Sequence, residues 1–326
     1  MPMKPKNDLL IFTPQGIYCP RANIYIDPTR RVDYAIITHA HADHARKGMK
    51  RYLAHHDCVP LLKLRLGADI SIRGVDYGEM ITVNGVRFSL HPAGHIIGSA
   101  QVKVEYQGEI WVVSGDYKLE DDGFCLPFEP IRCHTFITES TFAMPVYQWP
   151  GQEKAIEEMN QWWAENAKQG KTSILLGYSL GKAQRLLHSL AEGIGPIYTD
   201  SAVENTNQVL REHGIHLRET QQLHEDISIE DLKKALIIAP ANILQSPLAA
   251  KIPDFSLANA SGWMMLRNSR KRWGADQGFI ISDHADWPGL NRAIRATGAA
   301  KIYVTHGMAE LFSQYLQEQG LDAEVV

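Results

Sequence analysis

Short runs of apolar, β-branched and aromatic residues, separated by turn residues, dominate the first part of the chain. These runs predict strands at 9–13, 16–19, 23–27, 34–38, 86–94, 100–106 and 109–116. Several runs end in a polar residue, as in α/β folds that present functional side chains on loops held by a rigid sheet. The pattern therefore predicts a strand-rich region with its chemistry at the strand ends.

The pattern changes after residue 140. An amphipathic stretch at 153–170 predicts a helix, and alternating strand-like and helix-like runs follow at 172–179, 181–195, 197–200 and 235–240. Strands that alternate with helices are typical of a small parallel-sheet α/β unit. The last part of the chain returns to apolar strands that end in histidine, at 278–287 and 301–308.

Composition narrows the class of protein only in part. The net charge of −4 over 326 residues gives no overall nucleic-acid signature, so a polyanion site would have to be a local patch. The four cysteines stand apart without a C-x-x-C pair and indicate isolated thiols in a reducing compartment. The first residues lack an apolar signal core, and no apolar run approaches the roughly 18 residues of a membrane span. A cytoplasmic protein without membrane contact is expected.

The strongest chemical signal is ITHAHADH at 37–44, where a strand-like run ends in three histidines and an aspartate. His39, His41, Asp43 and His44 offer the imidazole nitrogens and carboxylate oxygen that zinc and neighbouring divalent metals prefer. Alternation should direct His39 and His41 to one side of the loop. Asp43 and His44 are expected at the start of a following helix and can point elsewhere, so one segment can serve two metals.

Three later strand ends complete a two-metal set. The predicted ligands are His39, His41 and His95 for one metal, Asp43, His44 and His306 for the other, and Asp116 as the bridge between them. A pair of metals about 3.5–4 Å apart stabilises the attacking and leaving oxygens of a phosphoryl displacement and lowers the pKa of a bridging water to near 7.

These motifs, with Asp27 in NIYIDP, resemble the metal-binding motifs of the metallo-β-lactamase fold, an αββα sandwich. The segments around Glu139 in FITEST, His284 in SDHADW and His306 in VTHG resemble motifs A, B and C of the β-CASP nucleases. The resemblance spans essentially the whole chain and implies an α/β protein, a sandwich with an inserted β-CASP cap. The implied ranges are 1–143 for the first part of the metallo-β-lactamase domain, 144–281 for the cap and 282–326 for the C-terminal part of the first domain.

The resemblance also implies roles for individual residues. Asp27 would brace the histidine loop by hydrogen bonds, although it can also be the simple start of the turn DPTR. Glu139 would act on His284 or on the water that the metals activate, and His284 would contact the scissile phosphate and protonate the leaving oxygen. The implied cofactors are two Zn²⁺ ions, with Mn²⁺ as a substitute, and the implied catalytic residues are Asp43, Asp116, Glu139 and His284.

Two further segments carry candidate substrate contacts. Ser179 and Lys182 in LLGYSLGKAQRLL stand where a strand meets a helix, and the stretch looks like the S-x-G-K segment near the substrate phosphates of β-CASP nucleases. The alternative is an exposed lysine at an ordinary helix start. In WMMLRNSRKRW, basic residues between tryptophans can follow a strand backbone, but a solvated basic loop explains them nearly as well. These basic residues are Arg267, Arg270, Lys271 and Arg272.

The motifs point to two kinds of substrate. A histidine at motif C, His306, matches the RNA-processing branch of the β-CASP nucleases, whereas 260–290 closely resembles the bacterial ligase-associated DNA exonucleases, which keep that histidine. The resemblance implies a DNA exonuclease acting in repair on single-stranded or end-containing DNA, with an ATP-dependent DNA ligase and a helicase as partners. An RNA-processing nuclease and a noncatalytic nucleic-acid-binding scaffold stay open. A small-ester hydrolase would have no use for the cap.

Overall fold

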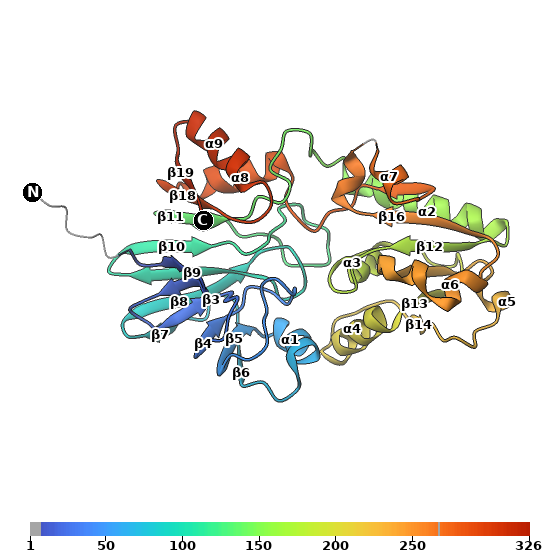
Figure 1. Ribbon diagram of the computed structural model, residues 1–326, viewed down its shortest axis with the longest axis horizontal. Helices are drawn as coiled ribbons and strands as arrows, with labels where there is room; N and C mark the ends of the chain where they lie inside the picture. Colours follow the sequence, from blue (N-terminus) through green and yellow to red (C-terminus); the bar gives the residue numbers. More distant parts are fainter. Residues whose placement is uncertain (1–7, 267) are drawn as a thin grey trace, which may run out of the picture. The chain divides into compact units, whose positions relative to one another are not determined.

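The protein consists of two compact units in the computed structural model, which describes residues 8–266 and 268–326 (Figure 1). Unit 1 combines Met1–Pro145 with His284–Val326, and unit 2 is Val146–Asp283. Unit 1 is therefore discontinuous in sequence, because the whole of unit 2 is inserted between its two segments.

The N-terminal segment of unit 1 forms a six-stranded sheet within residues 8–145. The strands lie in sequence order, and they are antiparallel as far as β3 and parallel from β3 to β6. The strands are β1 (Ile11–Thr13), β2 (Gly16–Cys19), β3 (Ile24–Ile26), β4 (Tyr34–Ile36), β5 (Arg51–His55) and β6 (Ile72–Val75).

A seven-stranded sheet takes strands from both described segments of unit 1, in the order β19-β18-β11-β10-β9-β8-β7. The four strands from β19 to β10 are parallel, and β9, β8 and β7 continue the sheet antiparallel. The strands are β7 (Ile81–Val83), β8 (Val86–Pro92), β9 (Ala100–Tyr106), β10 (Glu109–Val113), β11 (Thr135–Thr138), β18 (Lys301–Val304) and β19 (Asp322–Val325).

The two sheets of unit 1 share one apolar core. Ile26 and Leu53 from the first sheet and Phe88 and Val102 from the second belong to the same buried cluster. The opposite face of the seven-stranded sheet is covered by α8 (Trp287–Thr297) and α9 (Ala309–Glu318), and α1 (Cys58–Leu66) contacts β5 and β6. This packing holds the loops at the strand ends on a rigid frame.

The described residues of unit 2 form a six-stranded sheet in the order β14-β13-β15-β12-β16-β17, and all its pairings are parallel. The expected parallel α/β pattern is therefore confirmed. The strands are β12 (Thr172–Leu176), β13 (Ile197–Thr199), β14 (Gln221–Gln222), β15 (Leu236–Ala239), β16 (Phe255–Ala260) and β17 (Gln277–Phe279). The helices are α2 (Gln152–Lys168), α3 (Lys182–Ser189), α4 (Ser201–Glu212), α5 (Ile229–Leu232), η1 (Ala241–Gln245), α6 (Pro247–Lys251), η2 (Gly262–Met265) and α7 (Ser269–Arg272).

One local prediction in unit 1 is wrong. No helix follows Asp43 and His44, because the chain makes a single turn closed by the Ala45 N–H on the carbonyl of His41 at 2.9 Å. Gly48 then takes a positive φ of 104°, and the next regular element is strand β5. The histidine segment is thus a compact loop between β4 and β5.

Two further observations bear on the physical class of the protein. In residues 8–266 and 268–326, no helix combines the length and the apolar character needed to cross a bilayer. The four cysteines form no disulfide among the described residues, and all four are buried.

Gly98 lies in the loop that carries His95 and packs against the start of α1. We expect Gly98→Ala to destabilise unit 1. Its φ is +73°, and a β-carbon there would lie 2.3 Å from the backbone nitrogen of Cys58. The substitution should lower the free energy of unfolding in urea by at least about 2 kcal/mol. Gly78→Ala is the control, since its φ is +77° with nothing within 4 Å of the added carbon. Equal losses for the two variants would contradict a close contact at Gly98.

Candidate metal centre

The histidine loop is held at its base by hydrogen bonds to Asp27. The backbone N–H of Thr38 donates to Asp27 Oδ1 at 2.8 Å, and the Thr38 hydroxyl donates to Asp27 Oδ2 at 2.6 Å. The same carboxylate oxygen lies 2.7 Å from Nδ1 of His44. One carboxylate therefore fixes both the strand exit and an imidazole further along the loop. Thr38 was not singled out from the sequence, where its position directly before His39 was the only signal.

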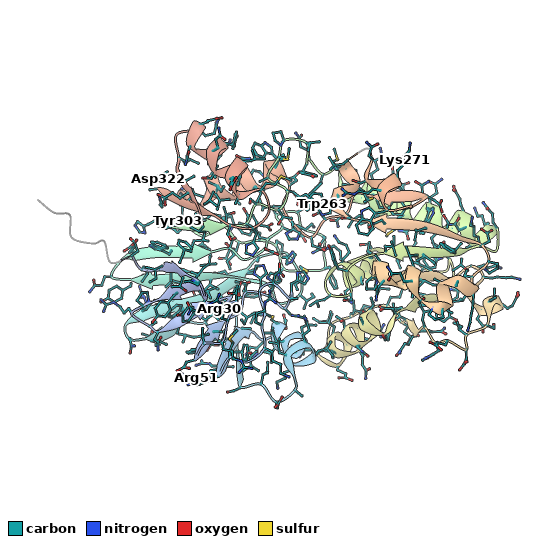
Figure 2. All side chains as sticks on the ribbon, viewed as in Figure 1. Arg30, Arg51, Trp263, Lys271, Tyr303 and Asp322 are labelled. Atoms are coloured by element: carbon teal, nitrogen blue, oxygen red, sulfur yellow. The ribbon has the colours of Figure 1, made fainter. Side chains whose placement is uncertain are left out.

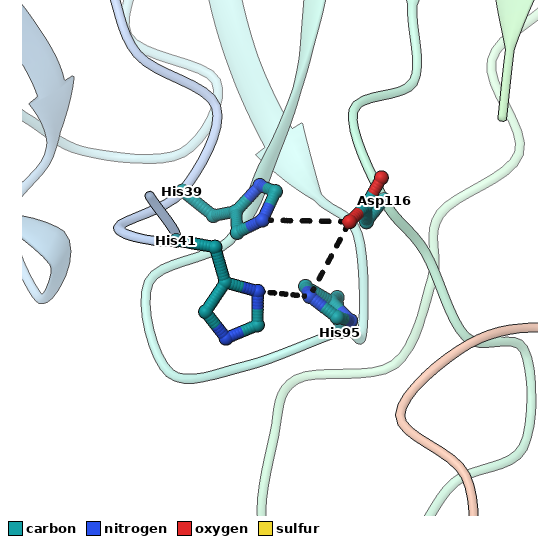
Figure 3. Close-up of side chains that lie close together, drawn as sticks. All are labelled: His39, His41, His95 and Asp116. Carbon is teal, nitrogen blue, oxygen red and sulfur yellow. Dashed lines mark hydrogen bonds and ion pairs between the residues drawn. The ribbon is translucent and has the colours of Figure 1, made fainter. Parts of the chain in front are cut away.

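Two histidines of this loop converge with a third histidine and an aspartate into a first ligand group (Figure 3). One ligand atom from each of His39, His41, His95 and Asp116 lies within 4.8 Å of the others. Asp116 Oδ2 is 3.6 Å from His39 Nε2 and 3.7 Å from His95 Nε2, and His95 Nε2 is 3.0 Å from His41 Nδ1. The side chains come from the β4–β5 loop, the β8–β9 loop and the segment after β10.

A second group forms on the other side of the same aspartate. Asp43, His44 and His306 also place one ligand atom each within 4.8 Å of one another, and the rings of His44 and His306 stack with centroids 4.9 Å apart. His44 Nε2 lies 3.4 Å from Asp116 Oδ1 and 3.8 Å from Asp43 Oδ2. Asp116 therefore turns one oxygen to each group, which is the arrangement of a bridging ligand.

The donor set fits divalent metals. Nε2 of His39 and Nε2 of His44 are buried and have no hydrogen-bond partner among the described residues. A buried polar nitrogen without a partner is unfavourable by about 1–3 kcal/mol, and one metal ion in each ligand group would satisfy the two atoms. Imidazole nitrogens with carboxylate oxygens are the ligand types of zinc and its neighbours in the first transition row.

The two buried imidazoles of His39 and His44 differ in the direction of their pKa shifts. Burial, and then the neighbouring His44, lower the pKa of His39 well below its ordinary value. For His44, burial alone would lower the pKa, but Asp116 and Asp27 outweigh it and hold the pKa well above its ordinary value. Burial would raise the pKa of Asp116, but His44 outweighs it and keeps that pKa well below its ordinary value. The site therefore combines a neutral imidazole with an ionised bridging carboxylate.

A third group joins Asp116 to Glu139 and His284, again with one ligand atom each within 4.8 Å. The buried carboxylate of Glu139 accepts the backbone N–H of Tyr117 at 2.8 Å and faces Nδ1 of His284 with both oxygens, at 3.1 and 3.0 Å. The His284 side chain is 22% exposed. Glu139 therefore holds the Nδ1 side of the His284 ring.

Two non-glycine residues of this centre have a strained backbone. Asp27 and His306 adopt positive φ angles of 45° and 55°, which non-glycine residues seldom do. Gly115, directly before Asp116, has φ +57°, and a β-carbon there would lie 2.8 Å from Cβ of Thr38. Strained residues persist where the surroundings over-determine them, and they cluster at functional sites.

Asp27→Asn should weaken metal binding without unfolding the protein. The amide keeps the shape of the side chain but loses the charge that orients His44, and loss of such an outer partner typically reduces metal affinity by about 10–100-fold. Competition with a chromogenic chelator would measure the change. Thr29→Val is a control on the same β3–β4 connection, because the Thr29 hydroxyl donates to the carbonyls of Pro14 and Gln15. Unchanged affinity in Asp27→Asn would contradict the bracing role.

The predicted substrate residues lie in unit 2 and have mixed outcomes. The structure does not support Lys182 as a phosphate contact, because it is only 3% exposed and its ammonium lies 2.9 Å from Asp283 Oδ2 and 2.7 Å from the carbonyl of Ile281. It is equally not the exposed lysine of the alternative. Ser179 is half-buried, and its carbonyl accepts the amide of Gln184.

The basic segment of unit 2 is only partly described. Lys271 and Arg272 are exposed, and Figure 2 labels Lys271 together with Trp263 of the same unit. Arg267 and the side chain of Arg270 lie outside the described residues. A role for this segment in strand binding stays a prediction.

No family model matches the sequence. The chain is 29% identical to the "Probable DNA ligase" of Opitutus terrae over 313 residues, which are 94% of this chain and 30% of that protein. It is 34% identical to "Endoribonuclease ysh1" of Schizosaccharomyces pombe over 129 residues, which are 39% of this chain and 17% of that protein. The chain thus spans less than a third of either relative.

The solved structures include a similar fold. A crystal structure of a protein of unknown function from Enterococcus faecalis V583 matches with a TM-score of 0.60 over 90% of this chain and 78% of that chain. The two sequences are 12% identical, so the likeness shows the fold alone.

Proposed function

Because this chain belongs to the metallo-β-lactamase/β-CASP family, we propose that it is a metal-dependent nuclease that hydrolyses phosphodiester bonds in DNA from an end. The observation that carries the proposal is Asp116, which turns one carboxylate oxygen toward each of two His/Asp groups. A carboxylate placed in this way can be shared by two metals about 3.5–4 Å apart, the spacing of two-metal phosphodiesterases. In this proposal, residues 1–143 and 282–326 are the metallo-β-lactamase αββα sandwich, and 144–281 are the β-CASP cap.

Two zinc ions, with manganese as an alternative, would be held by the seven residues of the first and second groups. They would supply positive charge for the phosphate oxygens and acidify water near neutral pH. The role of the chain is to orient these ligands. Asp27 fixes the Nδ1 side of His44, so its Nε2 is the ring nitrogen directed at Asp116 and Asp43.

The Glu139–His284 pair supplies the acid. The buried carboxylate of Glu139 stabilises a proton on Nδ1 of His284 and holds the ring in one orientation. In its protonated form, His284 donates the proton on Nε2 to the leaving oxygen of the cleaved phosphodiester, which would otherwise depart as an alkoxide. Asp116 thus belongs both to the first ligand group and to the cluster that contains the proposed proton donor, His284.

The extent of the similarity supports DNA as the substrate. The relative named as a DNA ligase matches along 94% of this chain, while the relative named as an endoribonuclease matches along 39%. The first alignment also supports association with an ATP-dependent DNA ligase, and a helicase is proposed with it in DNA repair. RNA cleavage is the second candidate function, and it is favoured by the endoribonuclease similarity and by His306.

Matched DNA and RNA strands would test the proposal. Single-stranded and duplex substrates of one sequence, labelled at either end and carrying a 5′-phosphate or a 5′-hydroxyl, are incubated with zinc- or manganese-loaded protein. We expect mononucleotides from DNA from the first time points, and the label that is released early gives the polarity. Faster cleavage of RNA would replace the DNA assignment, and internal fragments would replace the exonuclease assignment. No hydrolysis of either polymer by metal-loaded protein would overturn the proposal.

A further inference from the structure

The segment around the histidine loop is basic although the chain is acidic. Residues 30–65 contain eight lysines and arginines, three aspartates and no glutamate, while the whole chain has a net charge of −4. The ligands His39, His41, Asp43 and His44 lie inside this segment. The local excess of positive charge therefore lies on the segment that supplies four of the predicted metal ligands.

Arg65 brings this charge into direct contact with the histidine loop. It lies in the last turn of α1 and is exposed, and its guanidinium donates a hydrogen bond to the carbonyl of Ala40. Ala40 stands between His39 and His41. The charged end of Arg65 is thus fixed beside two predicted metal ligands, whereas most surface arginines sample many rotamers.

Three other cations lie in the histidine loop or pack against it. Lys47 reaches the end of α1, where its Nζ lies 3.8 Å from the position of a β-carbon on Gly67, and Arg31 lies over Gly48 with its Nε 2.9 Å from the β-carbon position there. Arg46, Lys47 and Arg31 are exposed. We call Arg31, Arg46, Lys47 and Arg65 the loop patch.

The cations of the loop patch lack acidic partners. None of the four forms an ion pair with a carboxylate among residues 8–266 and 268–326, whereas Lys50 of the same segment pairs with Asp33 at 2.7 Å. Asp43, a predicted metal ligand, acts on Arg65 through its charge, and Oδ1 of Asp69 is 3.0 Å from the β-carbon position on Gly67. Like charges held together on a surface repel one another, and an anion that bridges them relieves this repulsion.

We infer that the loop patch binds the phosphate backbone of the nucleic-acid strand beside the metal centre. Its cations are exposed and come from the β3–β4 connection, the histidine loop and α1, so they suit an extended polyanion better than a single small anion, which would need convergent donors. The inference rests on the proposed nuclease function and names one of its substrate contacts. Positive charge at the end of α1 would also stabilise that helix through its dipole. The experiment must therefore distinguish a loss of strand binding from a loss of helix stability.

The experiment measures strand binding against salt with the metal-loaded protein. The probes are a short labelled oligothymidylate with phosphorothioate linkages, which keeps one charge per linkage and resists hydrolysis, and the same oligomer with uncharged methylphosphonate linkages. Each lost phosphate contact should reduce the slope of log K against log salt by about 0.7, which corresponds to about fivefold weaker binding at 0.1 M salt. We expect this loss for Arg46→Ala, Lys47→Ala and Arg65→Gln with the charged probe only.

The controls separate charge from structure. Arg132→Ala removes an equal charge from an exposed position near Gly298 in unit 1, and it should leave binding unchanged. Arg65→Lys should retain most of the slope, and metal content and urea unfolding are measured for every variant. The inference is overturned if the patch variants and Arg132→Ala bind alike, or if the Arg65→Gln loss follows lost metal while Arg46→Ala and Lys47→Ala bind normally. Because binding is measured without hydrolysis, these outcomes are distinct from a wild-type protein that binds strands and fails to cleave them.

Discussion

Asp116→Ala is expected to abolish hydrolysis and to reduce the metal content more than any other single substitution at the centre. Asp116 contacts His39 and His95 through Oδ2 and His44 through Oδ1, so its loss removes a ligand from both groups at once. Metal ions contribute several kcal/mol of charge stabilisation in the transition state, and activity should fall by roughly 10³-fold or more. Elemental analysis after reloading with zinc should give about two metals per wild-type chain and fewer than one per variant chain.

Glu139→Gln is the matched control for the metal measurement. Glu139 is buried in the same cluster, but its carboxylate is engaged by the Tyr117 N–H and by His284. The amide should therefore retain nearly the wild-type metal content while losing activity. If Glu139→Gln lost as much metal as Asp116→Ala, Glu139 would be a ligand. If wild-type protein bound fewer than one metal, the two-metal proposal would fail.

His284→Ala is expected to lower the rate of DNA cleavage by about 10²–10⁴-fold, which is the usual contribution of a placed general acid. The fold and the metal content should change little, because His284 is not among the seven predicted metal ligands, its Nδ1 faces Glu139, and its side chain is 22% exposed. The rate of DNA cleavage should also lose the part of its pH dependence that comes from protonation of His284. Single-turnover cleavage across pH would show this change.

The leaving group separates acid catalysis from positioning. Bis(p-nitrophenyl) phosphate releases a phenolate that needs no proton, so the His284→Ala variant should hydrolyse it at a rate close to that of the wild type. Equal losses on DNA and on the activated diester would show that His284 acts on the phosphate instead. Loss of metal together with activity would make His284 a ligand.

The first ligand group could be predicted because its information is local in sequence. His39, His41 and Asp43 lie within five residues at a strand exit, and His95 and Asp116 follow other strand runs. Strands β8 and β10 run in the same direction, each antiparallel to β9 between them, so the loops that follow them leave the same edge of the sheet. The alternating pattern of unit 2 was readable for the same reason.

Features that depend on distant contacts could not be predicted in this way. The sequence shows a lysine at a helix start, but Lys182 is buried because Asp283, which is remote in sequence, accepts its charge. The link from Arg65 to the Ala40 carbonyl likewise depends on where α1 packs. The prediction of a helix after His44 is wrong because a local turn and Gly48 with positive φ interrupt the chain. Neither feature can be recognised from the pattern of apolar and polar residues.

The discontinuity of unit 1 has a consequence for biosynthesis. A ribosome makes His39, His41, His95 and Asp116 before unit 2, whereas His284, His306 and strands β18 and β19 emerge only after it. A growing chain can therefore assemble the first ligand group while the second still lacks His306 and the acid is missing. Partly made or truncated chains should bind one metal at most and cleave nothing, so the order of synthesis would itself delay the proposed nuclease activity until the seven-stranded sheet is complete.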